Sequence, residues 1–172
     1  IILDLNNKTI TGTGATYRPL KVAGNNSDIA VTIKNGTVKT ENVTTKPEQA
    51  ACVLVYDGAD VTFENVVMNG SNYGVLMAGY NDYATGVSNN NITSIAIYQP
   101  TKGDLTINGG TITGSTAVYV KAGNLKVNGG TIIGNGEYAG YEYVESGATS
   151  TGDAIVIESC NYGYYGAPTA LI

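Results

Sequence analysis

Two tyrosine-rich segments carry the residues best suited to bind a ligand. The longer one, Glu137 to Gly152, combines three tyrosines with three glutamates, and a shorter one has a similar composition. A tyrosine ring can stack on a sugar ring, and a carboxylate can accept hydrogen bonds from sugar hydroxyls. The alternative is that the tyrosines pack these segments onto the body of the protein. The candidate ligand-binding residues are Tyr138, Tyr141, Tyr143, Glu137, Glu142, Glu145, Tyr80, Asp82 and Tyr83.

A ten-residue repeat supplies the elements that must position these segments. Its first and third positions are mostly apolar with a polar residue between them, which is typical of a half-buried strand, and its eighth position is always apolar. The repeat therefore predicts stacked coils of an all-β solenoid. The six copies are Leu3 to Gly12, Val31 to Thr40, Val61 to Gly70, Thr85 to Ser94, Leu105 to Gly114 and Leu125 to Gly134.

A bend is expected in the middle of each copy. The fifth position is always asparagine or glycine, the residue types that adopt a left-handed backbone at least cost. The residues are Asn7, Asn35, Asn65, Asn89, Gly109 and Gly129.

A further apolar strand follows each copy, which gives three short strands per coil and about six coils. An antiparallel sandwich is the competing architecture, but it does not require a constant bend residue. The six additional strands are Leu20 to Val22, Val53 to Val55, Val75 to Met77, Ile95 to Ile97, Val118 to Val120 and Ile155 to Ile157.

Coils of variable length, with constant strands and an asparagine or glycine bend, resemble the pectate-lyase-like family of right-handed parallel β-helices. The resemblance covers nearly the whole chain and implies a single β-helix domain over residues 1–172, which we expect to be a segment of a longer protein. It concerns architecture only, because this architecture carries lyases, hydrolases, adhesins and phage fibres alike.

In the catalytic members of that family, substrate lies along the outer face of the strand that follows the bend. A hydrolase would need two or three carboxylates there, and a lyase would need calcium ligands and a strong base. Strand alternation predicts that only three acidic or basic residues point outward on this strand: Glu158, Lys21 and Lys121. The single arginine, Arg18, lies in the first coil. We therefore expect no catalytic residues.

The same alternation predicts an outward row that is unusually apolar. Such a row would serve as a partner-facing stripe, unless it is ordinary surface apolarity or another part of the chain covers it. Its members are Leu54, Leu76, Ala96, Tyr119 and Val156.

Composition excludes several classes of function. The net charge is −5 and the nine basic residues are scattered, so nucleic acid is not an expected partner. No stretch is apolar for long enough to insert into a membrane, and no cluster suggests a metal site or another cofactor. Cys52 and Cys160 are expected to be unpaired, because four coils at about 4.8 Å each would separate them.

These observations lead to a hypothesis of a non-catalytic module, either a stalk or an adhesin-like segment, with a glycan or another protein or repeat copy as its partner. A bacterial, extracellular or cell-surface location follows from the family resemblance alone. The alternative is part of a carbohydrate-active enzyme, a polysaccharide lyase or glycoside hydrolase, whose catalytic coils lie outside this chain or in the tyrosine-rich segment. A purely architectural spacer is a third possibility.

Overall fold

The computed structural model describes residues 1–25, 28–43, 50–70, 95–136, 152–159 and 168–172. These residues contain strands and no helix, so none of them could form a membrane-crossing helix. The strands are β1 Ile2–Asp4, β2 Thr9–Gly14, β3 Leu20–Ala23, β4 Ala30–Val43, β5 Ala51–Tyr56, β6 Asp60–Asn69, β7 Ile95–Gln99, β8 Asp104–Ile107, β9 Gly110–Gly114, β10 Thr116–Val120, β11 Asn124–Val127, β12 Thr131–Gly134, β13 Ile155–Ile157 and β14 Thr169–Leu171.

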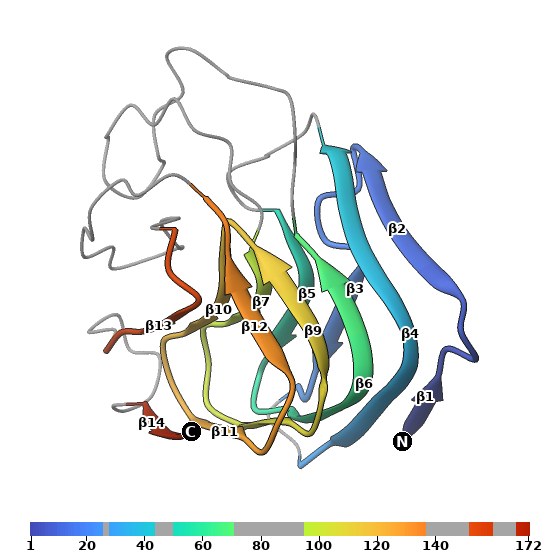
Figure 1. Cartoon of the computed structure of the whole chain (residues 1–172). Helices are drawn as coiled ribbons and strands as arrows, with labels where there is room; N and C mark the ends of the chain where they lie inside the picture. The colour runs from blue at the N-terminus through green and yellow to red at the C-terminus, as the bar shows by residue number, and fades with distance from the viewer. Residues whose placement is uncertain (26–27, 44–49, 71–94, 137–151, 160–167) are drawn as a thin grey trace.

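The strands form two parallel sheets, one of nine strands and one of five. The large sheet has a first column, β1-β4-β6-β8-β11-β14, and a second column in which β2, β4, β6, β9 and β12 lie side by side (Figure 1). The small sheet has the order β3-β5-β7-β10-β13. The chain alternates between the sheets, and every pairing among the described strands is parallel. The antiparallel sandwich is thereby excluded.

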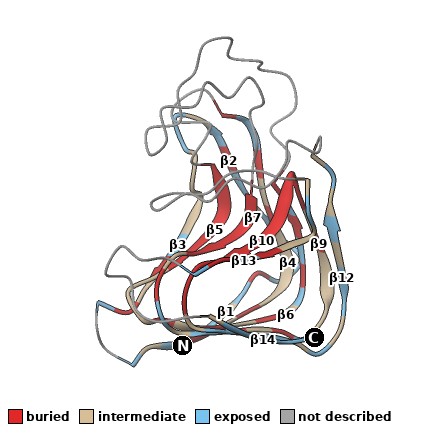
Figure 2. Cartoon of the chain, turned by 90° about the vertical axis from the view of Figure 1, so that its left-hand side faces the viewer, coloured by how far each residue is buried: buried red, intermediate tan, exposed pale blue. Residues whose placement is uncertain are grey.

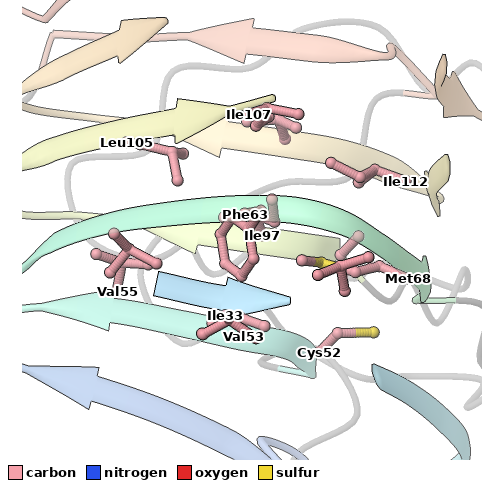
Figure 3. Packing of buried hydrophobic residues seen from close by; sticks show 14 of the residues in the cluster. Ile33, Cys52, Val53, Val55, Phe63, Met68, Ile97, Leu105, Ile107 and Ile112 are labelled. Atoms are coloured by element: carbon pink, nitrogen blue, oxygen red, sulfur yellow. The ribbon is translucent and has the colours of Figure 1, made fainter. Parts of the chain in front are cut away.

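The register of the large sheet confirms the repeat for the described copies. Equivalent apolar positions lie opposite each other, as in the pairs of Val31 with Val61 and of Val38 with Met68. These side chains lie in one core with those of the small sheet, and Phe63, Ile33 and Ile97 are fully buried there (Figure 3). Alternation at period two therefore places the apolar set correctly.

The order of the coils differs from the prediction at the fourth copy. β6 pairs directly with β8 and β9, and β5 pairs directly with β7. The predicted strands in Thr85 to Ser94 and Val75 to Met77 lie outside the described residues, and no strand from either segment stands between these pairs. The sixth strand of the first column is instead β14. β6 and β7, the described strands before and after residues 71–94, therefore belong to the same coil.

The ends of that segment meet. A Cβ atom added to Gly70 would lie 2.8 Å from the carbonyl carbon of Ile95, and Gly70 N donates a hydrogen bond to Thr113 O in the next coil. Glycine therefore fits a position at which the backbone entering β7 leaves no room for a side chain.

The asparagine bends are confirmed in the first three coils. Asn7, Asn35 and Asn65 have φ values of 59°, 55° and 53°. In the last bend the positive φ falls on Gly130 and not on Gly129, so the prediction is one residue early there. Asn89 lies outside the described residues.

The bend generates a stability prediction at Asn65. Substitution of Asn65 by Val should lower the free energy of unfolding by about 1–2 kcal/mol, because a β-branched residue is forced into the left-handed region. Asn65→Gly should be nearly neutral. Asn65 is a cleaner site than Asn35, whose side chain also donates to Asp4. Urea unfolding of both variants measures the difference, and equal losses would show that backbone strain is not the cause.

Cys52 is a free, fully buried cysteine at the start of β5, while Cys160 lies outside the described residues. Burial raises the pKa of the Cys52 thiol to about 12, although hydrogen bonds with Thr40 and Asn69 act in the opposite direction. The thiol is therefore protonated in the folded protein.

This raised pKa predicts a pH dependence of stability. Because the unfolded thiol ionises near pH 8.5, its contribution to stability is complete below that pH. It is lost as the pH rises toward the folded pKa of about 12. The free energy of unfolding should therefore fall more steeply over this range in the wild type than in Cys52→Ala, as measured by urea titrations at each pH. Parallel pH profiles would show that the thiol is not shielded from solvent.

Candidate functional site

The side of the small sheet away from the central core carries a continuous row of side chains. Leu54, Tyr98, Tyr119 and Val156 are adjacent by register and belong to a second apolar cluster, separate from the central core. Alternation therefore assigned Leu54, Tyr119 and Val156 to the correct side. Ala96 was misplaced, because Tyr98 is the residue opposite Leu54 and Ala96 lies in the central core. Leu76 lies outside the described residues.

This row is buried within the chain. Leu54 is 5% exposed, Tyr119 0% and Val156 6%, and Figure 2 shows β5, β7 and β10 almost entirely in the colour of buried residues. Of the alternatives that the sequence left open, the structure supports a covered row. The described members therefore do not form the exposed, partner-facing stripe.

Three polar groups converge at the end of this row. Lys121 directly follows β10 and Glu158 directly follows β13; the pairing of Val120 with Ile157 brings them side by side. Lys121 Nζ lies 2.8 Å from Glu158 Oε1, and Tyr119 Oη donates a 2.6 Å hydrogen bond to Glu158 Oε2. The Lys121 ammonium also lies 5.8 Å from the centre of the Tyr119 ring.

Burial gives this polar group its energetic weight. The side chains of Lys121 and Glu158 are only 2% and 1% exposed. Two charges removed from water must be compensated by each other and by further hydrogen bonds, because an unpaired buried charge costs several kcal/mol. The Tyr119 hydroxyl supplies such a bond, of the short charge-assisted kind. The group therefore ties β10 to β13 at the edge of the small sheet.

The chemistry open to this group is limited by these contacts. One oxygen of Glu158 faces the ammonium and the other accepts from the tyrosine hydroxyl. A general acid or base must instead reach a proton on a substrate. The arrangement is that of a structural ion pair with a tyrosine anchor.

The sequence contained a signal for this group that the prediction did not use. Lys121 and Glu158 are both predicted to point outward, and they occupy the same position of consecutive coils. Neighbouring coils bring equivalent positions within about 4.8 Å, so opposite charges at one position predict an ion pair. Lys21 instead has its ammonium 5.0 Å from the centre of the Tyr56 ring, and the Arg18 guanidinium lies 5.1 Å from that of Tyr17.

The tyrosine-rich candidates cannot be placed in this geometry. All nine fall outside the described residues: Tyr138, Tyr141, Tyr143, Glu137, Glu142, Glu145, Tyr80, Asp82 and Tyr83. Within the described residues, no three cysteine, aspartate or glutamate side chains are grouped so that they could hold a metal ion.

The described residues define an all-β repeat protein built from two parallel sheets, with a buried Lys121–Glu158 ion pair beside the small sheet. Comparison of the chain with protein-family models, with curated proteins and with solved structures gives no match.

The buried pair predicts a marked asymmetry between single and double substitutions. Lys121→Met leaves the Glu158 carboxylate buried without its cation and should lower the free energy of unfolding by about 3–5 kcal/mol. Adding Glu158→Gln should recover most of that loss, because no buried charge then remains. Urea unfolding of the two variants measures both values.

Lys34→Met provides the matched control. The Lys34 ammonium lies 3.7 Å from an Asp4 carboxylate oxygen, but both side chains are substantially exposed, so this substitution should change stability little. A loss at Lys121 no larger than that at Lys34 would show that the Lys121 pair is hydrated.

Proposed function

We propose that the chain is a segment of a right-handed parallel β-helix that serves as a non-catalytic module of a cell-surface protein, as a stalk or adhesin-like segment. The alternation of the chain between two parallel sheets supports the β-helix, since each coil returns to pair with the one before it. Right-handedness is the rule for crossovers between parallel strands of one sheet.

The non-catalytic assignment rests on the contacts that the Glu158 carboxylate makes within the protein. It is the one acid that the sequence places on the face where the resembled enzymes bind substrate. One of its oxygens lies 2.8 Å from the Lys121 ammonium, the other accepts a hydrogen bond from Tyr119, and its side chain is 1% exposed. These contacts favour a role in holding coils together.

A carbohydrate-active enzyme is the second candidate. Its support comes from the same three residues, because a carboxylate, an ammonium and a phenol, all groups that can exchange protons, meet on one face of the small sheet. In that case the cover of the face would have to open to admit a sugar chain.

Turnover separates the two proposals. The purified chain should not cleave polygalacturonate or plant and mucin glycans, with or without calcium, as measured by reducing-end release and by absorbance of unsaturated products. Turnover that disappears in Glu158→Gln but persists in Glu64→Gln would establish the enzyme instead. Glu64 is the control because it lies in β6 of the large sheet, away from the covered face.

Glycan binding through the tyrosine-rich segment belongs to the same proposal. On a glycan array, replacement of Tyr138, Tyr141 and Tyr143 by Ala should remove the signal while the melting temperature changes by no more than a few degrees. A large drop in melting temperature would show that these rings pack the protein.

A further inference from the structure

The outer face of the second column of the large sheet carries a regular row of β-branched side chains. Register aligns one residue from each of β2, β4, β6, β9 and β12, strands that lie side by side in Figure 1. We call this set the threonine row. Its members are Thr9, Thr37, Val67, Thr111 and Thr131.

The threonine row faces solvent. In each strand the next residue is apolar and points to the central core, as Val38, Met68 and Ile112 do, so the row lies on the opposite side. Thr9, Val67 and Thr131 are exposed, with Val67 at 45%, while Thr37 and Thr111 are partly exposed. Its exposure contrasts with the buried row of the small sheet.

The spacing of the row is set by the backbone. Parallel strands lie about 4.8 Å apart, so equivalent side chains repeat at that interval. A β-branched side chain has few rotamers, which keeps its methyl and hydroxyl groups in a similar orientation from strand to strand. A second row two residues further along, about 6.6 Å away, extends the array in the other direction. Its members are Thr11, Lys39, Asn69, Thr113 and Ile133.

The absence of charge distinguishes the threonine row from the outward rows of the first column. One of those rows aligns Asp4, Lys34 and Glu64, and the other, which contains Thr32, Thr62 and Thr106, continues to Lys126. The charged member of the second row, Lys39, has its ammonium 2.8 Å from Glu41 Oε2. Val67 has the shape of threonine without the hydroxyl, so methyl groups are the feature common to all five positions.

We propose that the threonine row binds ice. Methyl groups restrict the orientation of the water beside them, and hydroxyls between them can hydrogen-bond that water and fix its position. Each such contact is weak, so a ligand that binds tightly must contact several members of the row at once and must therefore have a matching spacing. A water lattice repeats in this way and carries no charge, which matches an uncharged row of five β-branched side chains at a constant spacing. This inference does not depend on the proposed function.

Partition of the protein into slowly growing ice tests the proposal. The wild-type chain should enter the ice fraction and suppress ice recrystallisation. Thr111→Lys, at the fourth strand of the row, should lose both effects, because a flexible hydrated ammonium breaks the methyl and hydroxyl pattern. Circular dichroism and the melting temperature show whether the variant is folded.

Thr62→Lys is the matched control. Thr62 lies in β6 on the outer face of the first column, level with Thr32 and Thr106, and is partly exposed as Thr111 is. It should keep the wild-type ice affinity. Exclusion of the wild-type chain from ice would overturn the proposal, as would equal loss of ice affinity in the two folded variants.

Discussion

The structure depends on parallel backbone pairing between one coil and the next. Because each strand bonds to the equivalent strand of a neighbouring coil, every residue lies beside the residue at its own position in the repeat, about 4.8 Å away. A favourable side chain is thereby used several times. An unfavourable side chain, such as an unpaired buried charge, would likewise lie beside the residues at its own position in the neighbouring coils. The repeat therefore constrains the residue type at each position of the coil, compared along the stack, more than it constrains the sequence of any single coil.

That constraint accounts for the contrast between the faces. In the core the columns are apolar, and at the bends they are asparagine or glycine. Along the polar edge they are hydrogen-bonding side chains: Asn124 Nδ2 donates to Asp104 Oδ1 over 2.7 Å, and Asn128 Nδ2 donates to Asn108 Oδ1 over the same distance. The Lys121–Glu158 pair follows the same rule, with opposite charges at one position of successive coils.

Much of this order was predictable from the sequence, because period-two alternation and the bend residues are local properties. The inward positions and the left-handed Asn35 and Asn65 follow from such patterns. The order of the coils at the fourth copy did not follow, because the interval between Met68 and Ile112 is long enough for an additional coil, and the sequence has an asparagine, Asn89, at the position expected for a bend. The burial of Tyr119 and Leu54 was left undecided, since alternation assigns a side of a sheet but does not show what covers it. The Lys121–Glu158 contact could be predicted only by comparing equivalent positions in neighbouring coils, and the repeat spacing of the sequence is sufficient for that comparison.

The meeting of Gly70 and Ile95 has a consequence for how such a protein can change. The entry and exit of residues 71–94 are adjacent, and β6 and β7 each pair with strands of neighbouring coils. The entropy of closing a loop grows only slowly with its length, so this junction can accept segments of very different size at similar cost. The junction between Gly70 and Ile95 is therefore a suitable site for the insertion of peptides or whole domains into this scaffold.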